Sequence, residues 1–339
     1  LAADTLDVDK LLPASPPAAA PAAPPAKDGK PPAQTDTPVD LSVLQGIDAQ
    51  GSFRVNRLLA RGVQASQVSG KLAVADGRAR LTEVSAQAYE GRLAGEAFAD
   101  AGAGQLGVKA AFSGVAIQPL LLAVAQYDAL SGRGDIALDL TATGKSVGAL
   151  RRALDGSVSL HLRDGRFKGI NVAQSLREFK TMLTAGRDAA QAADAERATD
   201  FSELRGELAL RQGVGTVREL MVAAPLLRVT QGEPAIVNVA EQSLDLTLNV
   251  RVVNTSTGQD GKELEQLRDI TVPIHLGGPF QAPEYRIQWS QVGSQALSRA
   301  LKNEAERQID RLLERRGDSG EGNGAGRILG DALKGLFNK

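Results

Sequence analysis

The sequence contains no cysteine and few aromatic residues. The absence of cysteine from all 339 positions excludes disulfide bonds, thiolate metal sites and cysteine nucleophiles. Phe, Trp and Tyr together make up 4% of the chain, so the core must be built mainly from aliphatic side chains. With 42% hydrophobic and 23% charged residues, the composition is typical of a soluble folded chain with one large or two ordinary domains.

The chain also lacks an excess of charge and a long apolar run. Its 39 basic and 40 acidic residues give a net charge of −1, which argues against a nucleic-acid partner. No run of about 18 apolar residues is present, and no signal peptide opens the chain, so no transmembrane helix is predicted in this segment. Because the chain starts at Leu1, we interpret it as a fragment or processed product, and any membrane anchor would have to precede Leu1.

No pattern of residues typical of a catalytic or metal site is found. His161 and His275 each stand between two aliphatic residues in an alternating pattern, which places both on the polar face of a strand. Neither has a second His at ligand spacing, which argues against zinc. No G-x-S-x-G motif occurs, and the "GNGAG" stretch at 322–326 has no strand before it. We therefore predict a protein that is not an enzyme and that has no catalytic residue, metal or cofactor.

A proline-rich segment divides the chain near its start. Nine of the fifteen prolines lie between Pro13 and Pro38, mixed with alanine. Such a segment donates few backbone hydrogen bonds and buries little, so we predict a disordered linker over 13–38. A proline-rich ligand for a partner domain is the alternative. Residues 1–12 are expected to belong to the β-domain that continues after the linker, over 39–289.

The stretch "LSGRGDIALDLTATG" at 130–144 contains the adhesion tripeptide Arg-Gly-Asp, at Arg133 to Asp135. Aliphatic residues alternate with small or polar ones directly after it, and this period of two is typical of a half-buried strand. We interpret Gly132 and Gly134 as the turn that begins this strand. Because the tripeptide runs into a strand, an adhesion signal is the less favoured interpretation.

Pairs of turn-forming residues between alternating stretches predict β-hairpins. Three such pairs are Asp76-Gly77, Asp164-Gly165 and Gln212-Gly213. A shift of 136 residues aligns the first hairpin with the third without a gap, and it pairs Gly70 with Gly206. Repeated β units of this kind predict an elongated sheet built by stacking neighbours edge to edge.

Three helices are predicted among the strands. "QPLLLAVAQYDAL" has Pro119 near its start, where a missing N–H costs nothing. "SVGALRRALDG" has Ser146 as its N-cap and Gly156 as its stop. "NVAQSLREFKTML" carries one apolar stripe. The members of that stripe are Val172, Leu176, Phe179 and Leu183.

The C-terminal part has a different pattern. Apolar residues at helical spacing predict one amphipathic helix over 290–316. A glycine-rich flexible linker over 317–326 and a short amphipathic segment over 327–339 follow. The predicted fold is therefore mainly β with helices (α+β): an elongated, curved antiparallel β-sheet with a C-terminal amphipathic helix.

One face of the predicted sheet is aliphatic. Its candidate lining residues are Ile136, Leu138, Leu140, Val158, Leu160, Leu162, Leu208, Leu210, Leu244, Leu246, Leu248 and Val250. From the residues alone, an ordinary core covered by helices is the favoured interpretation. The alternative is an uncovered apolar groove, since the candidate helices are few and large exposed apolar areas mark interaction sites.

Several stretches in order resemble the C-terminal region of AsmA-family proteins of Gram-negative bacteria. They include "LDGSVSLHLRDGRFKGINVAQSL", "ATDFSELRGELALRQGV", "MVAAPLLRVTQG" and "ITVPIHLGGPFQAPEYRI". The resemblance implies an inner-membrane anchor, extension into the periplasm, a β-rich apolar groove, and a link to outer-membrane biogenesis and phospholipid movement. The anchor is absent from this chain, and the Pro/Ala segment is longer than the family needs.

With the resemblance added, the aliphatic residues are interpreted as the lining of a groove that holds phospholipid acyl chains. The other implied partners are the inner membrane, through the absent anchor, and an outer-membrane or periplasmic protein at the C-terminal segments. The alternative function is a structural or chaperone-like module that binds protein partners during outer-membrane assembly.

Overall fold

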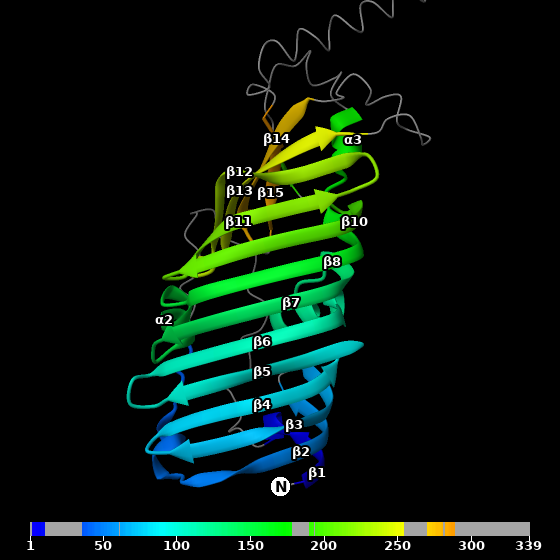
Figure 1. Cartoon of the computed structure of the whole chain (residues 1–339). Coiled ribbons are helices and arrows are strands. Elements are labelled where there is room, and N and C mark those ends of the chain that lie inside the picture. Colours follow the sequence, from blue (N-terminus) through cyan, green and yellow to red (C-terminus); the bar gives the residue numbers. More distant parts are fainter. Residues whose placement is uncertain are drawn as a thin grey trace, which may run out of the picture.

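The computed structural model describes residues 2–10, 36–60, 62–177, 190–192, 194–253, 270–280 and 282–288. Within them, fifteen strands form one elongated sheet that does not close on itself (Figure 1). Fourteen steps of about 4.8 Å between strands correspond to roughly 67 Å of sheet. The strands follow one another in chain order from β1 to β15, except that β9 pairs at the far edge beside β15.

The strands of the lower half are β1 (Ala2–Asp7), β2 (Ala49–Ala60), β3 (Val63–Ala75), β4 (Arg78–Ala88), β5 (Gly91–Asp100), β6 (Gln105–Ala116) and β7 (Leu130–Thr143). Those of the upper half are β8 (Asp155–Gly169), β9 (Ala190–Ala192), β10 (Asp194–Arg211), β11 (Val214–Ala223), β12 (Leu227–Asn238), β13 (Ser243–Val252), β14 (Thr271–Pro279) and β15 (Glu284–Ile287). The helices are η1 (Val8–Lys10), η2 (Ser42–Gly46), α1 (Ile117–Ala125), α2 (Val147–Arg152) and α3 (Val172–Arg177).

The expectation of a mainly β, elongated sheet is confirmed, but the sheet is mixed rather than purely antiparallel. Strand β1 runs parallel to β2, with Ala2 opposite Arg54 and Asp7 opposite Leu59. All other neighbouring strands described are antiparallel. A hairpin turn can join only antiparallel strands, and the long connection between β1 and β2 removes that restriction.

Two of the three predicted hairpin turns are confirmed. Asp76 and Gly77 join β3 to β4 with φ angles of 49° and 72°, and Gln212 and Gly213 join β10 to β11 with 50° and 74°. Two successive left-handed residues give the turn whose twist suits a two-residue hairpin. The 136-residue shift thus aligns two hairpins with the same turn geometry.

The prediction of a hairpin at Asp164-Gly165 is wrong, because both residues lie inside β8. Asp164 has a φ of 48° and marks a bulge rather than a turn. A Cβ on Gly165 would collide with the ring of Phe201 on β10 and with the carbonyl oxygen of Ser131 on β7. Close packing between strands therefore requires glycine at this position. In the sequence, such a glycine cannot be distinguished from a glycine in a hairpin turn.

The predicted turn at the start of 130–144 is also wrong. Gly132 and Gly134 lie inside β7, which already begins at Leu130. A Cβ on Gly134 would collide with the backbone of His161 in the neighbouring strand. Both glycines allow close approach of two strands at an irregular part of the sheet, where the β7–β8 register shifts.

The three predicted helices begin as expected, and α1 and α2 end sooner than predicted. Pro119 lies in the first turn of α1, and the hydroxyl of Ser146 caps α2 by accepting from the N–H of Ala149 at 3.2 Å. Helix α2 ends at Arg152, and Gly156, its predicted stop, lies inside β8. Phe179 and Leu183 of the third predicted helix lie outside the described residues.

The predicted C-terminal segments, 290–316, 317–326 and 327–339, lie outside the described residues. The predicted linker is described only from Asp36, and Pro38 forms an isolated bridge with Ser146 beside α2. Within the part of the chain that is described, no helix combines the length and apolarity that crossing a bilayer requires.

Candidate functional site: the apolar face of the sheet

The twelve candidate lining residues lie on one face of the sheet, here called the apolar face. Residues directly opposite each other in paired strands point to the same face. The pairing connects one row of such residues from β3 to β13. This row consists of Leu72, Leu81, Ala97, Val108, Leu140, Gly156, Leu210, Gly215, Val237 and Leu244.

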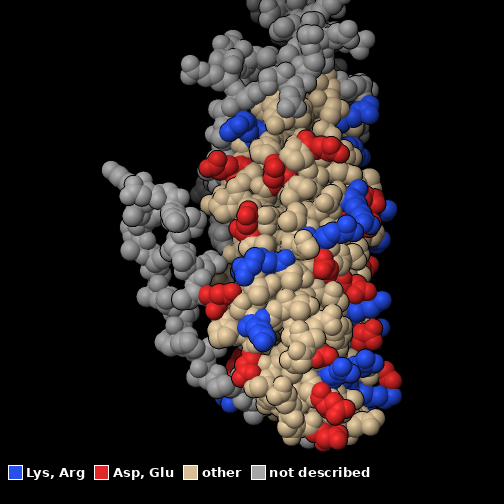
Figure 2. Space-filling view, turned by 90° about the vertical axis from the view of Figure 1, so that its left-hand side faces the viewer, with Lys and Arg blue, Asp and Glu red and all other residues tan. Residues whose placement is uncertain are grey.

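The opposite face of the sheet, here called the polar face, carries ion pairs between neighbouring strands. Lys109 contacts Asp139 at 3.3 Å, and His161 contacts Glu203 at 2.8 Å. Hydrogen bonds from Arg205 and then from His161 hold the pKa of Glu203 below its usual value. Acidic and basic groups are interspersed over the surface in Figure 2. The described residues contain no group of three or more His, Cys, Asp or Glu placed to hold a metal ion.

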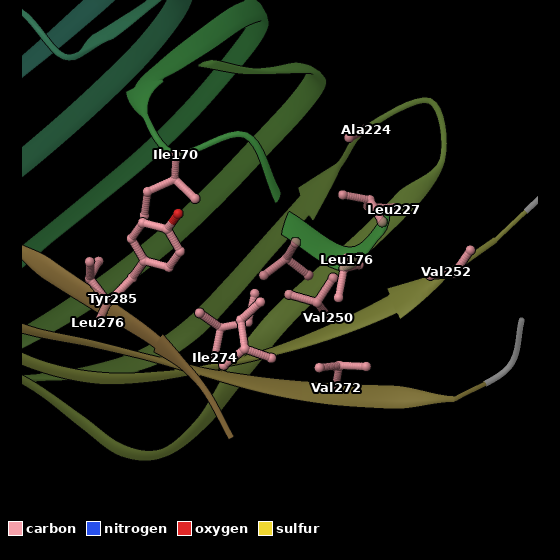
Figure 3. Close-up of a cluster of buried hydrophobic side chains, with 12 residues drawn as sticks. Ile170, Leu176, Ala224, Leu227, Val250, Val252, Val272, Ile274, Leu276 and Tyr285 are labelled. Carbon is pink, nitrogen blue, oxygen red and sulfur yellow. The ribbon is translucent and has the colours of Figure 1, made fainter. Parts of the chain in front are cut away.

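In the upper part of the sheet, the apolar face is a covered core. Helix α3 lies against strands β12 to β15, and Leu176 on α3 is 1% exposed (Figure 3). The hydroxyls of Ser175 and Tyr285, both buried, lie 3.3 Å apart. Among the candidate lining residues Val250 is fully buried here, and Leu244, Leu246 and Leu248 pack around the same cluster.

In the middle of the sheet, α1 covers the apolar face. Leu120 and Ile117 of this helix are buried with Leu162 of β8 and Phe201 of β10. Leu162 is 0% exposed, and the candidate residues Ile136 and Leu160 pack against the same cluster. This section is therefore also core, which agrees with the interpretation that the residues alone favoured.

In the lower part of the sheet, the apolar face is hollow. A cavity of about 570 Å³ lies over strands β3 to β7, and α2 forms its side with Val147 and Leu150. Val108, in the middle of its floor, is 40% exposed although its neighbours are aliphatic. Leu140 is the only one of the twelve candidate residues that lines this cavity.

The remaining candidates lie beside these three sections. Leu138, Val158 and Leu208 are half-buried, and Leu210 is buried. The twelve candidates include no residue from strands β3 to β6, and most of the cavity lining was therefore missed. The missed residues are Leu72, Leu81, Ala97, Leu106 and Val108. The alternation of aliphatic and polar residues in "SGKLAVADGRARL", which predicts the hairpin at Asp76-Gly77, also places Leu72 and Leu81 on the apolar side and is the signal that could have found them.

Helix α2 is fastened beside the cavity by the segment that precedes β2. The carboxylate of Asp36 accepts from the hydroxyl of Ser146 at 2.6 Å and from the N–H of Gly148 at 2.7 Å. These two hydrogen bonds hold the pKa of Asp36 below its usual value. The N–H of Val39 also donates to the carbonyl of Lys145 at 2.9 Å. Helix α2, which forms the side of the cavity, is thus held by a segment more than 100 residues earlier in the sequence.

Comparison with known proteins assigns the chain to a family. The chain is 24% identical over 288 residues to protein AsmA of Escherichia coli (strain K12). The match covers 84% of this chain but 45% of the relative, so the chain spans about half the length of that protein. No solved structure gives a significant match. The AsmA family profile matches residues 1–220, more than half of the chain, and the chain therefore belongs to the AsmA family.

Proposed function

We propose that this chain is a non-enzymatic periplasmic segment that holds phospholipid acyl chains on the apolar face of its sheet. Membership of the AsmA family suggests a membrane-associated protein of the cell envelope with a role related to the outer membrane. Because the chain spans about half of its relative, the inner-membrane anchor and the passage of lipid between the two membranes belong to the proposal for the whole protein.

The observation that carries this proposal is the aliphatic cavity over β3 to β7. Its volume of about 570 Å³ falls within the range of roughly 300–1,000 Å³ typical of ligand sites. Each buried methylene contributes about 0.8 kcal/mol, and association costs at least about 4 kcal/mol. A ligand must therefore bury roughly five or more methylenes, which suits a fatty acyl chain better than a small metabolite.

The continuity of the apolar row supports movement along the sheet. The row that includes Val108 and Leu140 continues through Leu210 to Leu244 without a charged residue on the way. Where α1 and α3 cover this face, an acyl chain would have to displace them or pass beside them. We therefore propose the lower cavity as the holding site and the covered sections as parts that open during transfer.

The test is a charge placed on the floor of the cavity. Val108→Asp should leave the protein folded, because a 40% exposed side chain keeps access to water. Native mass spectrometry should detect copurified phospholipid with the unchanged protein and none with the variant, since the carboxylate would stand in the path of the acyl chain. Circular dichroism checks the fold.

The matched control is Ala111→Asp, which adds the same charge to an exposed position on the polar face of the same strand. This variant should keep its lipid. Absence of phospholipid from the unchanged protein would overturn the proposal, and bound polypeptide in its place would favour the chaperone-like alternative. A folded Val108→Asp variant that still carries lipid would exclude this cavity as the holding site.

A further inference from the structure

A second and larger depression lies at the lateral edge of the sheet that is opposite α2. Strands β2 to β7 and helix α1 form its walls, and its volume is about 1180 Å³. Helix α1 begins here directly after β6, and Gly62, between β2 and β3, lies next to Ala123 of the helix. The depression therefore extends from the ends of the strands to the outer side of a helix that covers the apolar face.

Three arginines border this depression. Arg57 and Arg92 are exposed on the polar face of β2 and β5, and neither has an ion pair or hydrogen bond with another described residue. Arg133 on β7 pairs with Glu90 and donates to the carbonyl of Gly114 at 3.1 Å. Because Glu90 neutralises Arg133, two uncompensated positive charges remain.

The register spaces the three arginines over one surface of the sheet. Arg57 is opposite Ser66, which is opposite Gln87, and Gln87 is opposite Arg92. At about 4.8 Å between strands, Arg92 lies three strands, about 14 Å, from Arg57 and two strands, about 10 Å across the sheet, from Arg133. Arg133 is also displaced along its strand, because it is opposite Ala116 whereas Arg92 is opposite Ser113. The residues between the arginines include the small side chains of Ser66 and Ser113, which leave space for a ligand over the strands.

The side of the depression towards the apolar face is apolar. Leu122 and Ala123 of α1 border it, and Leu122 is 54% exposed. Two residues earlier, on the other side of the same helix, Leu120 is buried against the apolar face with Leu162. One short helix thus stands between the arginines and the aliphatic surface, so a ligand with an anionic group and an apolar body matches both sides of the site.

We propose that this depression binds the phosphate group of a phospholipid whose acyl chains lie on the apolar face. The proposal rests on the proposed function and adds a headgroup site to it. Guanidinium groups present paired N–H donors whose geometry matches phosphate oxygens. Arg57 and Arg92 hold the phosphate, and α1 separates it from the acyl chains.

The test compares two lipids that differ only in the phosphate-containing headgroup. The affinities of the protein for dioctanoylphosphatidylglycerol and for dioctanoylglycerol are measured by calorimetry. The unchanged protein should prefer the phospholipid. The double variant Arg57→Gln/Arg92→Gln should lose roughly tenfold in affinity for the phospholipid, as expected for the loss of charge-assisted hydrogen bonds. Its affinity for dioctanoylglycerol should not change.

The matched control is Arg80→Gln/Arg211→Gln. These two arginines are also exposed and unpaired among the described residues, but they lie towards the α2 edge. An equal loss in this control would show general electrostatic attraction and overturn the proposal. Equal binding of both lipids by the unchanged protein would refute the headgroup site while leaving the proposed function intact, whereas binding of neither would refute the proposed function.

A third arm distinguishes a lipid headgroup from free phosphate. Titration with sodium phosphate alone should show binding far weaker than that of the phospholipid, because the acyl chains contribute most of the affinity. If inorganic phosphate binds as tightly as the phospholipid, and the arginine double variant removes that binding, the depression is a phosphate site unrelated to lipid and the proposal is overturned.

Discussion

The carboxylate of Asp135 accepts a hydrogen bond from the backbone N–H of Gly114 at 2.9 Å. Arg133 donates to the carbonyl of the same glycine, which has a φ of 64° at a shift in the β6–β7 register. Both charged residues of the Arg-Gly-Asp tripeptide therefore hold a bulge in the neighbouring strand. The tripeptide lies inside β7 rather than at a loop tip, which argues against the adhesion interpretation.

This arrangement predicts that Asp135 matters for stability through its acceptor atoms. Asp135→Ala leaves the N–H of Gly114 without this partner and should lower the free energy of unfolding by about 1 kcal/mol. Asp135→Asn keeps an acceptor oxygen and should cost less. Urea unfolding of both variants measures the difference, and equal costs would show that the hydrogen bond contributes nothing.

The division of the apolar face into core and cavity predicts two different costs of truncation. Leu162 is 0% exposed under α1, and Leu162→Ala should lower the free energy of unfolding of the protein by about 2–5 kcal/mol. Val108→Ala, in the floor of the cavity, should cost about 0.5 kcal/mol, as at a surface position. The free energies of unfolding in urea give both numbers. Similar costs at the two positions would contradict the distinction between a covered and a hollow section.

The glycine in the β8 bulge predicts a steric effect. In Gly165→Ala, the new methyl group would collide with the ring of Phe201 and the carbonyl oxygen of Ser131, and we expect a loss of about 1–3 kcal/mol. Gly51→Ala in β2 is the control, because a Cβ there would have nothing within 4 Å. Thermal unfolding should separate the two variants, and equal melting temperatures would rule out the predicted collision.

The contacts of Asp36 predict a dependence of stability on pH. Its pKa is held below the usual 3.8, chiefly by the hydroxyl of Ser146 and then by the N–H of Gly148. A carboxyl group with a lowered pKa stabilises the folded state fully above its unfolded pKa, and this contribution is lost as the pH falls through the folded pKa. Asp36→Asn should therefore melt at a lower temperature than the unchanged protein at pH 6.

The difference should shrink below about pH 4, as the carboxyl group of the unchanged protein takes up its proton. Melting temperatures of both proteins at pH 6, 5, 4 and 3 measure this dependence. Asp48→Asn is the control, because Asp48 is exposed and has no hydrogen bond or ion pair with another described residue, so the loss of its charge should not change the gap between pH 6 and pH 3. A gap for Asp36→Asn that stays constant with pH would contradict the assignment.

Glycine positions show where sequence reasoning reached its limit. A left-handed residue followed by glycine forms a hairpin turn at Asp76-Gly77 and a bulge at Asp164-Gly165, although the two pairs read identically. Which one forms depends on whether Phe201 packs over the glycine, and that residue comes from another strand. Local pattern alone carries no information about this contact.

The sequence by itself determined that the chain is mainly β, which side of several strands is apolar and where the helices start, because these follow from period-two alternation and local capping at residues such as Ser146. Only the tertiary structure decided which parts of the apolar face are core and which are hollow. Leu162 and Val108 stand in equally aliphatic patterns, but α1 lies over the first and no helix among the described residues lies over the second. Burial depends on what packs above a side chain, and for both residues the neighbours that decide it come from other elements of the chain.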